Sequence, residues 1–257
     1  MPVVVITGVS SGIGKDLAEL LISKGFKVYG LARRETKLDG LNFLKCDVTD
    51  LNNIKNVKQI IEEKENKIDI LVNNAGMGIA GSILDSNYED INKIFQTNVM
   101  GVIAVTKEFL SLIKDEGKII NVGSVAGDLT IPYQGFYSMS KSAVDKFSEC
   151  LSIELKPRKI KVTTILPGDT KTGFTESRKT VIKEDSAGTA AKSIKKMEKD
   201  EQNGVSPRKV SKVILKVIKK KHPPIRVAVG FFYKLVIFLQ RLLPRKLVLA
   251  IIKKMYS

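Results

Sequence analysis

Hydrophobic positions follow an alternating pattern from the start of the chain to Gly168. Short continuous runs rich in Val and Ile have the length and composition of buried strands. Between them, longer segments place Leu, Ile and Val three or four positions apart, as one face of a helix requires. Strands are predicted at 2–7, 26–32, 42–45, 68–72, 118–122 and 160–166. Helices are predicted at 15–24, 51–65, 88–114 and 136–156. This alternation predicts an α/β fold with a parallel, doubly wound sheet.

The pattern is looser after Gly168. Residues 170–204 are mostly polar, and we expect them to form a mobile lid. A basic amphipathic helix is expected at 207–221, with Ser206 as its N-cap and Pro207 at its first position. The remaining elements expected are a strand at 226–229 and helices at 231–243 and 245–255. We therefore predict one main domain at 1–230, including the lid, and a basic amphipathic helical extension at 231–257.

Positive charge is concentrated in the last part of the chain. The 257 residues include 43 Lys and Arg against 27 Asp and Glu, a formal net charge of +16. Residues 205–257 hold 14 of the basic residues and no acidic one. The other 29 basic residues are nearly balanced by the 27 acidic ones. The excess charge therefore needs a local explanation.

Composition excludes several classes of site. His222 is the only histidine, which rules out histidine-based triads and multi-histidine metal sites, and we expect no metal. Cys46 and Cys150 are far apart in apolar sequence, which indicates reduced core thiols in a cytoplasmic protein. The first residues lack a basic region and a cleavage site, and no run of about 18 uncharged apolar residues occurs. We therefore expect neither a signal peptide nor a membrane-spanning helix.

A candidate acid–base pair lies in the sequence Tyr137-Ser-Met-Ser-Lys141. In a helix these two side chains lie on one face, about 6 Å apart. A phenol titrates near pH 10 in water, and an adjacent ammonium lowers that pKa by favouring the phenolate. Such a tyrosine can exchange a proton with an oxygen near neutral pH. Ser124 could hydrogen-bond the same oxygen if the fold brings it alongside. The competing interpretation is a Tyr/Lys pair on a solvated helix face.

A glycine-rich turn, Thr7-Gly-Val-Ser-Ser-Gly-Ile-Gly14, joins the first predicted strand to its helix. Glycines let the backbone approach a pyrophosphate closely, and a helix N-terminus offers free N–H groups and a positive dipole end. The position between a buried strand and a helix is the context that a Rossmann-type dinucleotide site requires. The glycines follow the spacing GxxxGxG.

This spacing resembles that of the compact short-chain dehydrogenase/reductases, and the resemblance continues in order over residues 1–172. Asp47 follows the third strand, as the family's adenine-contacting aspartate does. Asn73-Asn-Ala-Gly76 matches the family's NNAG signature, and Pro167-Gly168 matches the PG after its sixth strand. The family's catalytic positions are matched by Asn98, Ser124, Tyr137 and Lys141. The ordered agreement favours the chemical interpretation of the Tyr/Lys pair.

The resemblance implies a nicotinamide dinucleotide cofactor and hydride transfer to or from a carbonyl or alcohol carbon. Tyr137 would then act as general acid in reduction, and Ser124 would stabilise the substrate oxygen. Lys141 would hold the ribose hydroxyls, and Asn98 would anchor a water of the proton relay. The positions expected to contact the cofactor are Gly8, Ser10, Ser11, Gly12, Ile13, Gly14, Arg33, Arg34, Asp47, Val48, Asn74, Ala75, Gly76, Tyr137, Lys141, Pro167, Gly168, Thr170 and Thr172.

Arg33-Arg34 ends the second strand, where an acidic residue would hold the ribose diol of NAD(H). Arginine pairs instead with a 2′-phosphate, so we predict a preference for NADP(H), with NAD(H) as the alternative. Two solvated arginines are the competing interpretation. Thr172 fits a contact to the cofactor's carboxamide. Thr170 departs from the family's PGxVxT pattern, because it has a hydroxyl in place of an aliphatic side chain.

Three interpretations of the basic extension stay open. It could pack on the domain or form a dimer interface, attach to an anionic membrane surface, or bind an acidic partner such as an acyl carrier protein. It lacks a recognised nucleic-acid motif, and no nucleic acid is expected. By the family likeness, the helices around Asn98 and Tyr137 would form a homodimer or homotetramer.

The sequence Pro-x-Arg-x-x-Val-Gly at 224–230, followed by Leu-Pro-Arg at 243–245, resembles the extension of hydroxysteroid, retinol and acyl-dihydroxyacetone-phosphate reductases. That likeness predicts a bulky apolar carbonyl or alcohol substrate, lipid- or steroid-like. The chief alternative is a 3-oxoacyl-[acyl-carrier-protein] reductase, which usually lacks such an extension. A non-catalytic NADP(H)-binding regulatory protein is the alternative from another class, and the complete catalytic set argues against it.

Overall fold

A seven-stranded parallel sheet forms the centre of the computed structural model, which describes residues 1–181 and 187–256. Its strand order is β3-β2-β1-β4-β6-β7-β9. The strands are β1 (Val3–Thr7), β2 (Lys27–Ala32), β3 (Leu41–Lys45), β4 (Ile68–Asn73), β6 (Ile113–Val122), β7 (Lys161–Leu166) and β9 (Arg226–Ala228). The chain winds outward in both directions from β1 and β4, which is the topology of a Rossmann-type doubly wound sheet. The predicted fold class is confirmed.

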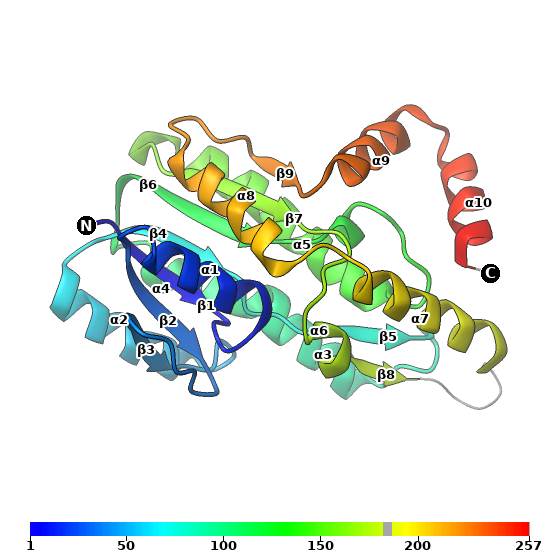
Figure 1. Ribbon diagram of the computed structural model, residues 1–257, viewed down its shortest axis with the longest axis horizontal. Coiled ribbons are helices and arrows are strands. Elements are labelled where there is room, and N and C mark those ends of the chain that lie inside the picture. Colours follow the sequence, from blue (N-terminus) through cyan, green and yellow to red (C-terminus); the bar gives the residue numbers. More distant parts are fainter. Residues whose placement is uncertain (182–186, 257) are drawn as a thin grey trace.

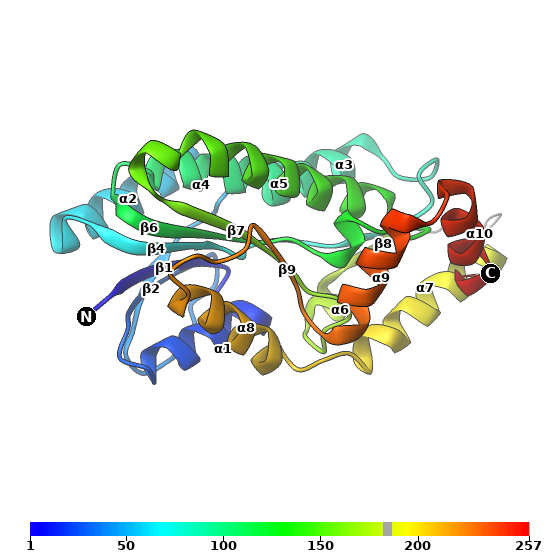
Figure 2. The same cartoon turned by 90° about the horizontal axis from the view of Figure 1, so that it is seen from above.

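Helices cover both faces of the sheet (Figure 2). One face carries α2 (Leu51–Glu65), α4 (Gly101–Phe109) and α5 (Gly135–Glu154), and the other carries α1 (Gly12–Ile22) and α8 (Pro207–Lys219). The packing of strand β1 explains why its sequence is continuously apolar. Val3 and Val5 pack in one core cluster, whereas Val4 and Ile6 pack in the other. Successive side chains point to opposite faces, so a strand buried on both sides needs apolar residues throughout.

The remaining elements gather at one end of the molecule, past the carboxyl ends of the central strands (Figure 1). They are β5 (Ile79–Gly81), α3 (Tyr88–Phe95), the 3₁₀ turn η2 (Val125–Gly127), α6 (Phe174–Ser177), β8 (Lys179–Val181), α7 (Ala187–Gln202), α9 (Phe231–Leu242) and α10 (Arg245–Tyr256). A further 3₁₀ turn, η3 (Lys156–Arg158), follows α5. Strands β5 and β8 form a separate two-stranded parallel sheet. None of the helices in the described ranges is long and apolar enough to cross a bilayer.

The helix predicted over 88–114 is interrupted and ends early. Between α3 and α4 the chain forms a π-helical turn, η1 (Gln96–Met100). Helix α4 ends at Phe109, and strand β6 begins at Ile113, earlier than the predicted strand. Leu112 and Ile113 are buried in the core, and the Leu112 carbonyl accepts a hydrogen bond from the Ile68 amide. Burial against β4 therefore outweighs the helical spacing.

The polar segment predicted as a lid contains regular structure that its composition concealed. Helix α7 buries Ala190, Ile194 and Met197, spaced for one helix face, while its other positions are mostly Lys, Glu and Asp. Residues 182–186 of the expected lid, and residue 257 of the expected extension, lie outside the described residues. The prediction of two core thiols is wrong for Cys150, which is exposed, unlike the buried Cys46. Ser206 is the N-cap of α8 and Pro207 its first residue, as predicted, although the Ser206 side chain makes no capping hydrogen bond.

Candidate active site

A cleft of about 1650 Å³ runs along the carboxyl ends of the sheet. Its walls include the segments that follow β1, β2, β4, β6 and β7, where ligands bind in doubly wound folds. Nearly all of the predicted site residues line it. The exceptions are Gly14 and Asn98, which lie behind its surface.

The glycine-rich turn is shaped by close packing against the segment after β4. A Cβ at Gly14 would lie 2.3 Å from the Gly8 carbonyl oxygen, so this position has no room for a side chain. Asn74 Nδ2 donates to the carbonyls of Thr7 and Gly8, at 3.0 and 3.1 Å. Gly12 has a φ of +58° and faces the cleft near Thr172. The turn presents backbone to the cleft at the N-terminus of α1, which suits a pyrophosphate.

The adenosine end of the predicted cofactor site is charged and open. Arg33 and Arg34 are exposed at the end of β2, and both line the cleft. Asp47 is half-buried, and its Oδ1 accepts hydrogen bonds from the amide and the hydroxyl of Thr49, at 3.0 and 2.8 Å. Val48 and Ala75 supply apolar surface between these polar groups. The residues present therefore fit the adenosine end of a dinucleotide.

Tyr137 and Lys141 lie on one face of α5, as their spacing predicts. The Lys141 Nζ atom is 5.8 Å from the centroid of the Tyr137 ring and donates to the Val122 carbonyl at 2.9 Å. The Phe174 ring packs against Tyr137 with a centroid separation of 5.7 Å. A hydrogen bond also joins the Tyr137 phenol to Ser124. The structure thus brings the three predicted groups together.

Burial dominates the electrostatics of this pair. Desolvation raises the pKa of Tyr137 to about 12, and the hydrogen bond from Ser124 offsets only part of this rise. Desolvation lowers the pKa of Lys141 to about 8, because its side chain is only 7 % exposed. The prediction that the ammonium lowers the Tyr137 pKa is therefore wrong, since burial outweighs the neighbouring charge. The phenol keeps its proton at neutral pH.

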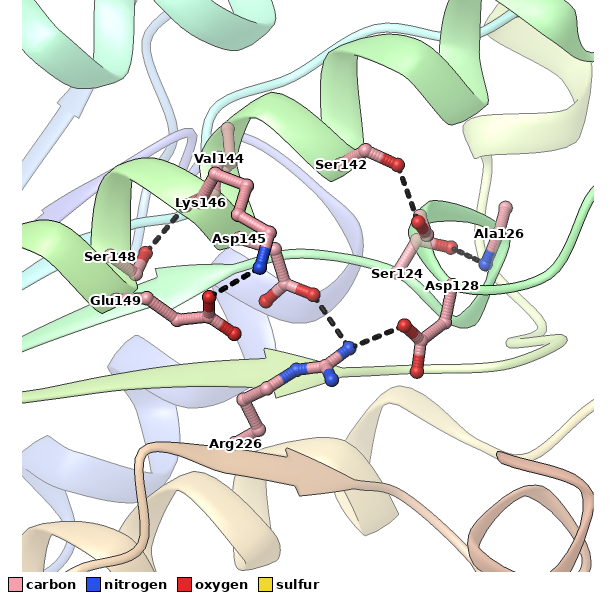
Figure 3. A network of polar contacts seen from close by, with 11 residues as sticks. Ser124, Ala126, Asp128, Ser142, Val144, Asp145, Lys146, Ser148, Glu149 and Arg226 are labelled. Atoms are coloured by element: carbon pink, nitrogen blue, oxygen red, sulfur yellow. Dashed lines mark hydrogen bonds and ion pairs between the residues drawn. The ribbon is translucent and has the colours of Figure 1, made fainter. Parts of the chain in front are cut away.

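An ion-pair network holds the Ser124 turn against α5 (Figure 3). Ser124 caps η2, and its Oγ accepts from the Ala126 amide at 3.1 Å. Arg226, on β9, reaches Asp128 at the end of this turn and Asp145 on α5, with N–O distances of 2.8 and 2.7 Å. The edge strand therefore ties together the two elements that carry Ser124 and Tyr137.

Asn98 lies behind the cleft wall and is fully buried. Its Oδ1 accepts from the Met77 amide at 2.8 Å, and its Nδ2 donates to the Met77 carbonyl at 2.9 Å and to Ser140 Oγ at 3.0 Å. The π-helical turn η1 aims this side chain at the loop after β4. A Cβ at Gly76 would be 3.2 Å from Asn98 Oδ1 and 3.5 Å from Lys141 Nζ, so a side chain at this position would crowd both groups.

The C-terminal extension forms one wall of the cleft, which the sequence pattern did not predict. Tyr233 on α9 stacks on Gly168, where an added Cβ would be 2.1 Å from the ring. Its phenol donates to the Asp169 carboxylate and accepts from the Asp169 amide at 3.1 Å. Further apolar lining comes from both terminal helices, namely Phe232, Val236, Leu239, Leu243, Val248, Ile251, Ile252 and Met255.

A second unpredicted group lies on the lid side of Tyr137. Arg178, after α6, pairs with Glu201 at the end of α7, and Thr175 donates to the same carboxylate. The side chain of Arg178 is only 1 % exposed. Thr170 Oγ1, in the same region, donates to the Gly168 carbonyl at 2.9 Å. No local sequence signal marks Arg178, because its partner is 23 positions away on a helix hidden by polar composition.

Comparisons with known proteins agree with this geometry. A profile described as short chain dehydrogenase matches residues 2–182. The chain is 42 % identical over 236 residues to a 3-ketodihydrosphingosine reductase of Bacteroides thetaiotaomicron, covering 89 % of this chain and 87 % of that protein. It is 36 % identical over 177 residues to an NADPH-dependent 1-acyldihydroxyacetone phosphate reductase of Schizosaccharomyces pombe, covering 66 % and 60 %.

Among solved structures, a short-chain dehydrogenase from Streptomyces avermitilis superposes with a TM-score of 0.81 at 26 % identity, covering 93 % of this chain and 92 % of that one. The fold, the profile match and the identity to named reductases all point to one assignment. The chain is a member of the short-chain dehydrogenase family and an NAD(P)-dependent oxidoreductase.

Proposed function

We propose that the protein is an NADPH-dependent reductase of a long-chain, lipid-like ketone. This proposal rests on the lining of the cleft. Tyr137, Ser124 and Lys141 contribute to it, and so does the apolar wall of α9 and α10. A small polar ketone would leave that wall without a partner. An extended apolar chain would cover it and lose contact with water at the same time.

Each polar group of the site has a role in the proposed chemistry. NADPH, when bound, supplies the hydride. The Tyr137 phenol donates its proton to the substrate oxygen, and its raised pKa keeps that proton in place until the oxygen becomes basic. Ser124 hydrogen-bonds the same oxygen and holds it near the phenol. Lys141, which lies beside the phenol ring, would hold the ribose hydroxyls of the cofactor, and Asn98 fixes the Met77 backbone behind the cleft wall.

The preference for NADPH rests on Arg33 and Arg34. Both guanidinium groups are exposed at the end of β2, and they can pair with a 2′-phosphate through charge-assisted hydrogen bonds. The Schizosaccharomyces pombe relative, named as NADPH-dependent, supports this preference. The alternative is use of NADH, which carries no 2′-phosphate.

The substrate class follows from the apolar wall and from the names of the relatives. 3-Ketodihydrosphingosine and 1-acyldihydroxyacetone phosphate are the substrates in those names, and both are lipids with a ketone. The relative named for 3-ketodihydrosphingosine aligns with 89 % of this chain. 3-Ketodihydrosphingosine is therefore the first substrate to test.

The test is a panel of ketones followed by loss of NADPH absorbance. It compares 3-ketodihydrosphingosine, 1-acyldihydroxyacetone phosphate, a steroid ketone, a short water-soluble ketone and a 3-oxoacyl carrier-protein thioester. We expect the highest kcat/KM with a long-chain ketone. A preference for the thioester would replace the proposal with the carrier-protein reductase, and no turnover with any substrate would favour a non-catalytic NADP(H)-binding protein.

Tyr137→Phe tests the proton donor within the same assay. Loss of one positioned acid is expected to lower kcat by about 10²-fold or more while NADPH still binds. Tyr88→Phe is the matched control, because Tyr88 is 85 % exposed and lies outside the cleft. Turnover retained in Tyr137→Phe would refute the assigned role.

We also propose that the enzyme forms a homodimer or homotetramer through the helices near the site. Met100 and Ile153, at η1 and on α5, are exposed apolar residues that fit such a contact. Light scattering after size-exclusion chromatography measures the mass of the particle. A monomer at all concentrations would contradict this proposal and leave the proposed reaction unaffected.

A further inference from the structure

The terminal helices α9 and α10 carry the largest group of exposed apolar side chains. Eleven of the 21 large apolar residues that are exposed in the described ranges fall between Phe231 and Met255. They are Phe231, Phe232, Leu235, Phe238, Leu239, Leu242, Leu243, Leu247, Leu249, Ile251 and Met255. Scattered exposed residues need no explanation, whereas so many on two successive helices indicate a binding surface. We call these eleven residues the apolar face.

The apolar face is held in a fixed position. Buried Ile237 packs α9 beside Val125 and Leu166, near the Tyr233–Asp169 contact. Helix α10 lies beside α7 (Figures 1 and 2), where Ser193 and Lys196 donate to the carbonyls of its last turn. Arg245 also donates to Thr130 Oγ1 at 2.7 Å. The two helices therefore line the cleft with one side and are exposed on the other.

Positive charge accompanies the apolar face along both helices. Six exposed basic residues lie on the same two helices, namely Lys234, Arg241, Arg245, Lys246, Lys253 and Lys254. No acidic residue occurs from 205 to 257. A second copy placed on this face would bring like charges together, and that is unfavourable. An acidic protein would match the charge but would also have to offer a large apolar surface.

We propose that α9 and α10 dock on the surface of an anionic lipid bilayer. The apolar face enters the boundary between headgroups and acyl chains, while the basic side chains lie at the headgroups. Five residues of the apolar face also line the cleft, so its mouth opens at the docked surface. If the proposed function holds, a membrane-borne ketone passes from the bilayer to Tyr137 along this wall without crossing bulk water.

Vesicle co-sedimentation tests the docking directly and needs no substrate. The full chain is mixed with phosphatidylcholine vesicles, with or without phosphatidylglycerol, at low and high salt. We expect binding to the anionic vesicles at low salt and its weakening at high salt. Each basic residue at an anionic surface strengthens binding about fivefold, so Lys234→Gln with Arg241→Gln should weaken it about 25-fold. Lys55→Gln with Lys64→Gln on α2 is the charge-matched control.

A second pair of variants tests the apolar contribution. Phe238→Ser with Leu242→Ser changes two exposed residues that do not line the cleft, and binding should fall at least tenfold. Leu84→Ser with Tyr88→Ser is the matched control, since both side chains are more than four-fifths exposed elsewhere. Absence of binding to anionic vesicles, equal binding to neutral ones, or unchanged binding in the α9 variants would overturn the proposal.

Two further measurements separate the possible outcomes. If Phe238→Ser with Leu242→Ser changes the particle mass in solution, the face belongs to a second copy and the membrane proposal fails. Turnover of a water-soluble ketone with NADPH, measured without vesicles, reports on the proposed function alone. The docking proposal predicts that this turnover is unchanged in the α9 variants, while vesicle-borne substrate is reduced more slowly.

Discussion

The Arg226 ion pairs offer a sharp test of how the fold holds the active site. Replacing Arg226 by Met keeps most of the side-chain volume and removes the charge that Asp128 and Asp145 share. Arg226 and Asp128 are each 19 % exposed at the side chain, and Asp145 is 8 % exposed. The change leaves two carboxylates close together and mostly away from water.

The expected loss of stability follows from that burial. Removing one partner of a fully buried ion pair costs about 3–5 kcal/mol, because the remaining charge is not compensated. The residual exposure of Arg226 and Asp128 lets solvent screen part of this charge, so we expect Arg226→Met to lose about 2–4 kcal/mol of unfolding free energy. Misplacement of Ser124 relative to Tyr137 should also lower kcat.

The loss should depend on pH in a defined direction. Burial already raises the pKa of Asp145 despite Arg226, and removal of Arg226 raises it further. A carboxyl whose pKa is higher in the folded than in the unfolded state binds more protons when folded, so stability falls as pH rises through that range. The deficit of Arg226→Met relative to the parent should therefore be smaller near pH 5 than near pH 8.

Urea denaturation at several pH values measures this deficit. Lys146→Met is the control, because its ion pair with Glu149 lies on the same helix but is exposed, and its removal should leave the unfolding midpoint unchanged. Neutralising both carboxylates in Arg226→Met, by Asp128→Asn and Asp145→Asn, should recover part of the stability. An unchanged midpoint in Arg226→Met, or a deficit that grows toward low pH, would contradict the proposed role.

Three other substitutions have definite expected outcomes. Lys141→Met removes a buried ammonium and should abolish turnover while raising the unfolding free energy by about 1–3 kcal/mol at pH 7; a less stable variant in urea would argue against the lowered pKa. Gly168→Ala should push Tyr233 off the cleft and lower stability by about 1–3 kcal/mol, measured by thermal unfolding; an unchanged midpoint would mean the loop adapts. Arg33→Asp should raise the KM for NADPH at least tenfold and lower that for NADH, whereas an unchanged ratio would exclude the 2′-phosphate contact.

Local sequence predicted the parts of the fold that depend on short stretches of chain. Strand β1 is readable because burial on both faces requires an uninterrupted apolar run. Tyr137 and Lys141 share a face because their spacing fits one helix. The glycine turn packs closely because its glycines have no side chains. These features need little knowledge of what packs against them.

The features that sequence did not predict depend on distant partners. Helix α7 buries only a narrow stripe that includes Ile194, and its other side is charged, so its composition resembles a loop. The contact of Tyr233 with Gly168 joins positions 65 apart in the chain, and no local pattern marks it. The pKa of Tyr137 depends on how deeply the ring is enclosed, and spacing from Lys141 carries no information about that depth.

The edge strand β9 also governs where the chain can be shortened. It pairs with β7 over three residues only, from Arg226 to Ala228, and its short length and leading charge discourage strand addition by other molecules. Strand β7 beneath it is longer and almost wholly buried. A chain truncated after Gly230 would keep β9, whereas one truncated before Arg226 would expose the β7 edge as a template for aggregation.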